Sequence, residues 1–191
     1  METLEKRILT DGEVRPGGIL KVDGFLNHRI DPQLSYDMAM ELKRLYEGTE
    51  INKILTIEAS GIAMAVMVAY VFQCPLVFAK KSKTKNISSN VWAVEVESFT
   101  HGNTNTVIVS KEYLGPDDRV LIIDDFLATG AALKGLKTLV EQAGGTVVGA
   151  GIAIEKAFQG GGDEMRASGM RVESLARIAR MTDDSIEFVR E

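Results

Sequence analysis

The chain has 191 residues, of which 45% are hydrophobic and 26% are charged, values that are ordinary for a globular protein and exclude a disordered one. A net charge of −5 disfavours binding to the phosphate backbone of nucleic acids. The single cysteine, Cys74, and the two histidines, His28 and His101, exclude an intrachain disulfide and a Cys/His zinc cluster. We therefore expect one cytoplasmic domain that acts on small molecules.

No segment has the pattern of a targeting signal or of a membrane span. The first 18 residues contain no uncharged apolar stretch, so we expect no signal peptide. The most apolar run, 62–72, has about half the length that a bilayer requires and predicts a core helix.

Helices and strands alternate along most of the chain. Asp31 and Pro32 predict the N-cap and first turn of a helix that ends near Gly48. The hydrophobic pattern predicts helices over 2–9, 31–47, 61–73, 130–143 and 160–169, and strands over 53–58, 76–79, 92–99, 105–111, 119–124, 146–154, 171–178 and 185–190. The strands on either side of the polar turn 101–103 are expected to pair. The helix 61–73 is apolar nearly all round and should be mostly covered.

The strand–helix–strand order predicts an α/β fold with a mostly parallel sheet and helices on both faces. Three segments follow strands of this sheet, namely 58–62, 80–90 and 124–132. Because ligands of open parallel sheets bind beyond the carboxyl ends of the strands, we expect the three segments to meet. The segment 80–90, KKSKTKNISSN, is either a plain solvated loop or a mobile loop that closes over an anionic substrate.

The segment 124–132 carries the strongest chemical signal. An apolar strand runs into Asp124 and Asp125, and small residues with Thr129 then open a helix at Gly130. Small residues let backbone amides approach a phosphate, and a helix N-terminus adds free N–H donors. The acids suit ribose hydroxyls or, through water, magnesium. The alternative is that the acids only cap the helix turn; a P-loop is excluded because no lysine follows the glycine.

The stretch 120–132, VLIIDDFLATGAA, resembles the signature of the type I phosphoribosyltransferases. The resemblance extends to the bacterial xanthine phosphoribosyltransferases within that family through ILKVDGFLNHRIDP (19–32), IEASGIA (57–63), IEKAFQ (154–159) and RVESLARI (171–178). It implies the type I phosphoribosyltransferase fold in a single domain over 1–191. The implied core covers about 50–155, and the implied small hood comes from about 1–48 and 156–191.

The same resemblance implies a purine-salvage enzyme. Its expected reaction converts xanthine and 5-phosphoribosyl 1-pyrophosphate (PRPP) to xanthosine 5′-monophosphate (XMP) and pyrophosphate. Guanine and hypoxanthine are expected to be weaker substrates. Magnesium is the implied cofactor, held mainly by the substrate and water rather than by protein ligands, and it neutralises the leaving group.

Roles for individual residues follow from the resemblance. The implied 5-phosphate cradle is Ala128, Thr129, Gly130, Ala131 and Ala132, and the implied pyrophosphate turn is Ala59, Ser60 and Gly61. Asp124 and Asp125 hold the ribose hydroxyls. Lys81, with Lys80 beside it, is expected to stabilise the leaving pyrophosphate as the lysine segment closes and excludes water.

Base recognition is implied for Leu20, Asn27 and Lys156. A lysine donates to a 6-oxo group and disfavours the amino group of adenine, and an asparagine can donate to a 2-oxo group. The ordinary alternatives are core packing for Leu20, a turn cap for Asn27 and a surface salt bridge to Glu155 for Lys156. Phe158 either stacks on the purine or packs in the core.

One position departs from the related hypoxanthine-guanine enzymes, which carry an aspartate before the Thr-Gly pair. Here Ala128 stands there, and its side chain cannot take the purine proton. The base either reacts as its anion, which the acidity of xanthine permits, or gives the proton to another group or to water. His28 is titratable and adjoins Asn27, although a lone histidine is usually a surface or turn residue.

The sequence bears on three other functions. An adenine phosphoribosyltransferase is the close alternative, because its motif also carries alanine before Thr-Gly. A PRPP-sensing regulator is disfavoured by the acidic charge and by core signals that begin near residue 20, and a dinucleotide-binding fold by the lack of a G-x-G-x-x-G turn. Members of the family usually form homodimers, and Met64, Met67 and Tyr70 are candidates either for that interface or for the core.

Overall fold

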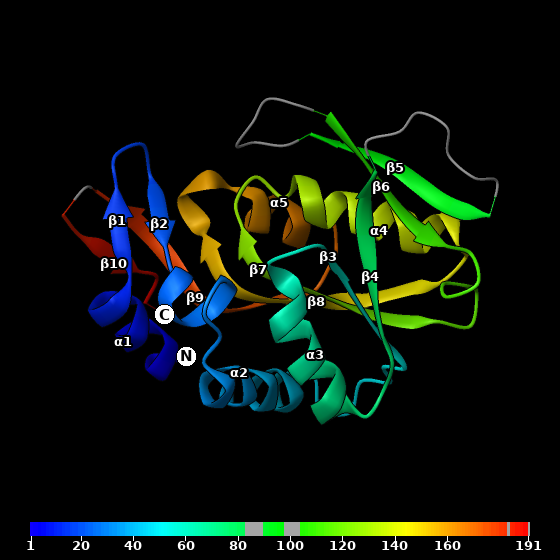
Figure 1. Cartoon of the computed structure of the whole chain (residues 1–191), viewed down its shortest axis with the longest axis horizontal. Coiled ribbons are helices and arrows are strands. Elements are labelled where there is room, and N and C mark those ends of the chain that lie inside the picture. Colours follow the sequence, from blue (N-terminus) through cyan, green and yellow to red (C-terminus); the bar gives the residue numbers. More distant parts are fainter. Residues whose placement is uncertain (83–89, 98–103, 183, 191) are drawn as a thin grey trace.

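An eight-stranded sheet forms the centre of the protein (Figure 1). The computed structural model describes residues 1–82, 90–97, 104–182 and 184–190. The strands of the sheet are β3 (Lys53–Ile57), β4 (Leu76–Ser82), β5 (Val91–Glu97), β6 (Thr104–Ser110), β7 (Arg119–Leu127), β8 (Thr146–Lys156), β9 (Val172–Met181) and β10 (Ile186–Phe188). Their order in the sheet is β10-β9-β8-β7-β3-β4-β6-β5.

The sheet is mostly parallel, as the chain pattern predicts. β3, β4, β7, β8 and β9 are parallel neighbours, whereas β10 and the β5–β6 hairpin pair in antiparallel fashion at the two edges. The predicted pairing of 92–99 with 105–111 is confirmed as β5 with β6. The predicted polar turn 101–103 between them lies outside the described residues.

Helices cover both faces of the sheet. They are α1 (Glu2–Asp11), α2 (Pro32–Leu45), α3 (Gly61–Phe72), α4 (Ala131–Gln142) and α5 (Gly161–Ala167). α2 and α3 lie against one face and α4 and α5 against the other (Figure 1). The predicted start of α2 is confirmed, because Asp31 Oδ1 accepts hydrogen bonds from the amides of Gln33 and Leu34, both at 3.1 Å.

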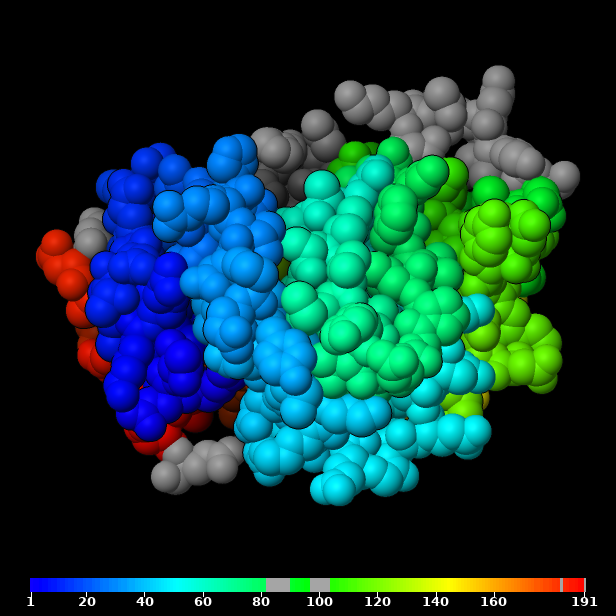
Figure 2. Space-filling view, turned by 60° about the horizontal axis from the view of Figure 1, so that its bottom comes forward, coloured from blue at the N-terminus to red at the C-terminus, as the bar shows by residue number. Residues whose placement is uncertain are grey.

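Two apolar clusters stabilise these layers. α2 and α3 bury residues such as Met38 and Met64 against one face of the sheet, and α4 buries Leu136 against the other. The expectation that α3 is mostly covered is confirmed, because within this helix only Val66, at 53%, and Tyr70, at 66%, are exposed. α3 packs against β3, β4 and β7 of the sheet and against its neighbour α2. Figure 2 shows the face of the molecule that α2 and α3 form.

Two central strands are longer than predicted. β7 continues to Leu127 because Phe126 and Leu127 pair with Ile154 and Glu155 of β8. β4 continues to Ser82 because its last three residues pair with β6. Asp125, Lys80 and Lys81, which were expected beyond the ends of the predicted strands, therefore lie within strands.

A short hairpin near the N-terminus was not predicted. Its strands are β1 (Glu13–Arg15) and β2 (Ile19–Lys21), and a single π-helical turn, η1 (Asp23–Asn27), follows it. Gly17 and Gly18 make the hairpin turn with φ angles of 87° and 74°, which side chains rarely adopt. The hairpin, α1, β9 and β10 gather at one end of the molecule (Figure 1). The division into core and hood stays a prediction.

Candidate active site

The carboxyl ends of β3, β4 and β7 open onto one cavity of about 220 Å³. The predicted residues that line it are Ser60, Lys81, Asp124, Asp125, Ala128, Thr129, Gly130, Ala131 and Ala132. Ala59 and Gly61 flank Ser60 without lining the cavity. Three chain segments that the sequence separates widely are therefore brought together at the edge of the sheet where ligands of such folds bind.

The turn 128–130 joins the end of β7 to the start of α4. Gly130 has a φ of 84° and accepts the first hydrogen bond of the helix, from the amide of Lys134 at 2.9 Å. The turn itself carries only small side chains and that of Thr129, and all three of its residues line the cavity. Amides at the start of a 12-residue helix provide donors and partial positive charge suited to a phosphate.

Asp125 connects three elements at the cavity wall. Its Oδ1 accepts a hydrogen bond from Ser60 Oγ at 2.9 Å, and its Oδ2 accepts one from Asn27 Nδ2 at 3.2 Å. The side chain is only 4% exposed, yet it lines the cavity. The alternative role of the two acids as helix caps is wrong, because α4 has no side-chain cap hydrogen bond.

Asp124 is also buried, at 7% exposed, and its carboxylate accepts a hydrogen bond from the amide of Asp125 at 3.0 Å. Burial, followed by the adjacent negative charge of Asp125, raises the pKa of Asp124 well above its usual value of 3.8. The positive charge of Lys81 opposes this rise in pKa. A ligand whose hydroxyl groups donate hydrogen bonds to this carboxylate would compensate its loss of hydration.

The turn 58–61 holds the second wall. The amide of Lys81 donates to Glu58 Oε1 at 2.6 Å, and the amide of Glu58 donates to the carbonyl of Ala79 at 3.0 Å. The Glu58–Ala59 peptide bond is cis. A Cβ at Gly61 would lie 2.4 Å from Thr56 Oγ1 and 3.1 Å from Asp124 Oδ1, so glycine allows α3 to begin directly against the acids.

The two lysines at the end of β4 differ in position. Lys81 lines the cavity, whereas Lys80 points to the other side of the strand, where its Nζ lies 5.8 Å from the centre of the Phe78 ring. The expectation that Lys80 shares the role of Lys81 is therefore wrong. Residues 83–89 of the predicted lysine loop lie outside the described residues.

None of the three proposed base-binding residues lines the cavity, although Asn27 and Lys156 contact residues that do. Lys156 ends β8, and its Nζ donates to the carbonyl of Gly18 at 2.9 Å and lies 5.7 Å from the ring centre of Phe126, which is a lining residue. Burial lowers the pKa of Lys156 below its usual value of 10.5. Leu20, two residues beyond Gly18, is 6% exposed and packs in an apolar cluster, so the alternative of core packing is confirmed for it.

Several of the ordinary alternatives for these residues are wrong. Glu155 pairs with Arg166, so it makes no salt bridge with Lys156. Asn27 bonds to Asp125 across the site rather than only capping its own turn. Phe158 is 45% exposed and is not a core residue.

The sequence did not point to the lining residues contributed by the edge hairpin. These are Val96 of β5 and Asn105 and Val107 of β6. β6 reaches the cavity because it pairs with the extended end of β4, where Lys81 lies opposite Val107. The order of strands at a sheet edge cannot be read from a local hydrophobic pattern, and Asn105 stands between two polar threonines, so no signal in the sequence could have suggested these residues.

The chemistry of the oxygen donors fits magnesium held through a substrate. Among the residues that the structure describes, no group of three or more His, Cys, Asp or Glu side chains is placed to hold a metal ion. Asp124 and Asp125 offer hard oxygen ligands that suit magnesium through water.

Across the described parts of the chain, no helix has both the length and the apolarity of a membrane span.

Residues 31–177 match the family model of the phosphoribosyl transferase domain. The chain belongs to the phosphoribosyltransferase family. Similar curated relatives include the xanthine phosphoribosyltransferases of Finegoldia magna, 54% identical over 98% of this chain and 99% of the relative, and of Bacillus cytotoxicus, 50% identical over 100% and 96%. The family membership confirms the resemblance drawn from VLIIDDFLATGAA.

Solved structures show the same phosphoribosyltransferase fold. The adenine phosphoribosyltransferase of Giardia lamblia, crystallised with 9-deazaadenine, superposes with a TM-score of 0.78 at 22% identity and covers 93% of this chain and 98% of its own. That of Thermoanaerobacter pseudethanolicus gives 0.73 at 24% identity, covering 91% and 99%. Identities this low establish the fold alone.

Proposed function

We propose that this phosphoribosyltransferase transfers the phosphoribosyl group of PRPP to xanthine, forming XMP and pyrophosphate. The observation that carries the proposal is one cavity in which the accessible turn 128–130 faces the paired acids Asp124 and Asp125. Relatives that match nearly the whole chain at 46–54% identity bear the name xanthine phosphoribosyltransferase, which supports xanthine as the base.

In this proposal the chain binds PRPP through three sets of groups. Backbone amides of 128–132 and the Thr129 hydroxyl donate to the 5-phosphate. Asp124 and Asp125 accept hydrogen bonds from the 2- and 3-hydroxyls of ribose, which also compensates their burial. The turn 59–61 faces the pyrophosphate, and the ammonium of Lys81 supplies charge beside it.

The reaction breaks the bond between the anomeric carbon and the pyrophosphate oxygen and forms a bond to a purine nitrogen. Negative charge grows on pyrophosphate as the bond breaks, so Lys81 stabilises the transition state more than the bound substrate. Magnesium, when bound with PRPP, neutralises part of that charge. Ala128 offers no proton acceptor, which suits a base that enters as its anion.

Lys156 gives the proposal its base selectivity. Its ammonium has three donors and uses one on the carbonyl of Gly18, so it can donate to a 6-oxo group as well. The 6-amino group of adenine would present donors to this ammonium and leave it without an acceptor. Asn27, held against Asp125, lies between the ribose site and the base and can donate to the 2-oxo group.

Steady-state turnover with PRPP, magnesium and each purine in turn tests the proposal. We expect the highest kcat/KM with xanthine, lower values with guanine and hypoxanthine, and the lowest with adenine. A chelator of magnesium should suppress all of them, which serves as the control for the metal. Absence of XMP formation from xanthine would overturn the assignment. A preference for adenine would instead support the alternative of an adenine phosphoribosyltransferase.

A homodimer and a cytoplasmic location belong to the proposal. The exposed apolar side chains of α2 and α3 support an interface on these helices, which lie on the face turned forward in Figure 2. They are Tyr36, Met40, Val66 and Tyr70. Met64 is 1% exposed and belongs to the core, so its candidacy for the interface is wrong. Sedimentation as a monomer at working concentration would contradict the dimer. The location follows from multiply charged substrates that do not cross a bilayer unaided.

A further inference from the structure

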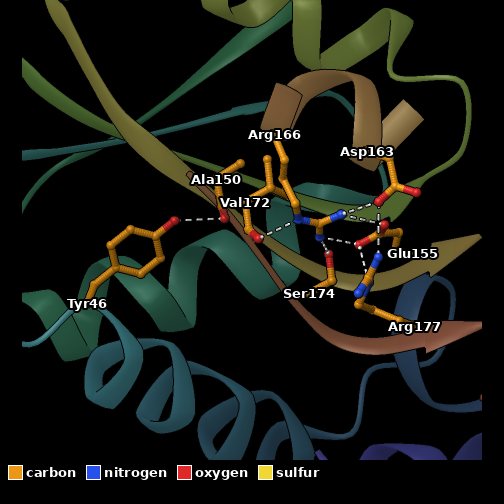
Figure 3. Close-up of polar contacts among 8 residues, drawn as sticks. All are labelled: Tyr46, Ala150, Glu155, Asp163, Arg166, Val172, Ser174 and Arg177. Atoms are coloured by element: carbon orange, nitrogen blue, oxygen red, sulfur yellow. Dashed lines mark hydrogen bonds and ion pairs between the residues drawn. The ribbon is translucent and has the colours of Figure 1, made fainter. Parts of the chain in front are cut away.

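An ion-pair cluster around the buried Glu155 lies beside the cavity and takes no part in the reaction described so far (Figure 3). Glu155, which is 0% exposed, accepts a forked pair of hydrogen bonds from Arg166, with Nη1 to Oε1 at 2.9 Å and Nη2 to Oε2 at 2.6 Å. Arg177 Nε lies 3.3 Å from Glu155 Oε2. Asp163 Oδ1 accepts a hydrogen bond from each of the two arginines at 3.2 Å. The two carboxylates and the two guanidinium groups therefore balance in charge.

The cluster holds a buried charge at some cost. Burial alone would raise the pKa of Glu155, but hydrogen bonds from Arg166 and Ser174 and the charges of Arg166 and Arg177 lower it below its usual value of 4.5. Such a pair is often no better for stability than apolar residues of similar volume. A role in geometry therefore explains its presence better than a role in stability alone.

Glu155 stands between the two halves of the substrate site. In the sheet it pairs with Leu127, the residue before the phosphate-binding turn, and in the chain it precedes Lys156. Its partner Arg166 belongs to α5, so the forked ion pair attaches α5 to the end of β8. Arg166 Nε also donates to the carbonyl of Val172 at 3.3 Å, which fixes the far end of the same helix.

α5 in turn presses against the phosphate-binding turn. The amide of Gly161, its first residue, donates to the carbonyl of Ala128 at 3.2 Å. A Cβ at Gly161 would lie 2.3 Å from that carbonyl oxygen and 2.4 Å from the carbonyl carbon of Thr129. A Cβ at Gly162 would lie 2.2 Å from Glu155 Oε1. Two consecutive glycines thus allow backbone contact with the turn on one side and with the ion pair on the other.

We propose that Glu155 and Arg166 are positioning residues for PRPP, which act by holding Gly161 against the backbone of the turn 128–130. The turn must keep its amides aimed at one phosphate, and a displacement of about 1 Å can reduce rates by about 10²-fold. The inference rests on the proposed function, because it assigns the 5-phosphate to this turn. It adds a support from Gly161, which contacts the turn but does not line the cavity.

Gly161→Ala tests the contact directly. We expect the KM for PRPP to rise about tenfold or more while the KM for xanthine stays within about twofold, because the added methyl group displaces the turn and not Lys156. Gly115→Ala is the matched control, since a Cβ there meets nothing within 4 Å. Calorimetric titration of PRPP into the variant, without any purine, should show the same loss of affinity.

Arg166 provides a second, milder test. Arg166→Lys keeps the charge without the fork, so it should retain more affinity for PRPP than Arg166→Met, with the KM for xanthine again nearly unchanged. Thermal unfolding of each variant separates folding from positioning, and Arg166→Lys decides the matter if Gly161→Ala does not fold. Unchanged affinity for PRPP in folded variants, or equal changes in both KM values, would overturn the inference. Wild-type protein that binds PRPP but makes no XMP would instead contradict the proposed function.

Discussion

The double exchange Asp124→Asn/Asp125→Asn is expected to reduce kcat/KM for PRPP about 10³-fold, the scale of removing preorganised groups that stabilise a transition state. Both carboxylates line the cavity and are almost fully buried, so their charge is felt strongly by a ribose that gains positive character. Asparagine keeps the shape of each side chain but removes that charge and half of its acceptor capacity. Steady-state rates at saturating xanthine with PRPP varied give the measurement.

A surface pair of acids provides the control for this double exchange. Asp117→Asn/Asp184→Asn changes the net charge by the same amount at exposed positions, so it should leave kcat/KM within about twofold of wild type. Circular dichroism should show native secondary structure for both doubles. Undiminished XMP formation by the folded Asp124/Asp125 double would remove the ribose assignment.

The stability of the single Asp124→Asn variant reports on the same carboxylate without any substrate. Because folding raises the pKa of Asp124 above its usual 3.8, the folded state binds more protons than the unfolded state as pH rises past that value. The charged carboxylate therefore lowers the stability of wild type progressively, and asparagine cannot. Urea unfolding at about pH 5 and about pH 8 should show that the free energy of unfolding of the variant, relative to that of wild type, is higher at the higher pH. A pH-independent difference would contradict the raised pKa.

The exchange Lys156→Ala is the second change expected to have a large effect. Loss of a charged hydrogen bond to the 6-oxo group should reduce kcat/KM for xanthine about 100-fold. The KM for PRPP should change little, because Lys156 borders the base side of the cavity and the phosphate turn is untouched. Competing rates with xanthine and adenine give the measurement, and adenine use should not fall.

Two comparisons make the Lys156 result specific. Lys6→Ala removes an exposed lysine at the N-terminal helix and should change neither substrate. Lys156→Ala also removes the contact with the carbonyl of Gly18, so its unfolding should be measured to exclude a displaced hairpin as the cause. An equal loss of rate for adenine and xanthine would contradict recognition of the 6-oxo group.

Local signals predicted the parts of the fold that depend on neighbouring residues. Asp31 before Pro32 predicted a helix start that the structure contains as a capped N-terminus. Two acids followed by small residues and Thr129 predicted a phosphate turn, because this composition leaves backbone amides accessible. The alternation of strands with helices along the chain predicted the parallel sheet. Parallel strands bring their carboxyl ends to one edge of the sheet whatever their order.

Features that depend on pairing across the chain were not predictable in this way. The three-residue strands on either side of Gly17 and Gly18 are too short for a periodic pattern. The lengths of β4 and β7 are set by their neighbours β6 and β8, so strands were predicted to end before Lys81 and Asp125. The partner of Glu155 is an arginine eleven residues away in the chain, rather than the adjacent lysine.

A crystal structure of the protein with XMP bound tests the central claim most directly. We predict that the phosphate accepts hydrogen bonds from amides of 128–132, that the ribose hydroxyls donate to Asp124 and Asp125, and that the 6-oxo group lies within hydrogen-bond distance of Lys156 Nζ. XMP bound with its phosphate away from the start of α4, or with its ribose away from the two aspartates, would contradict the account.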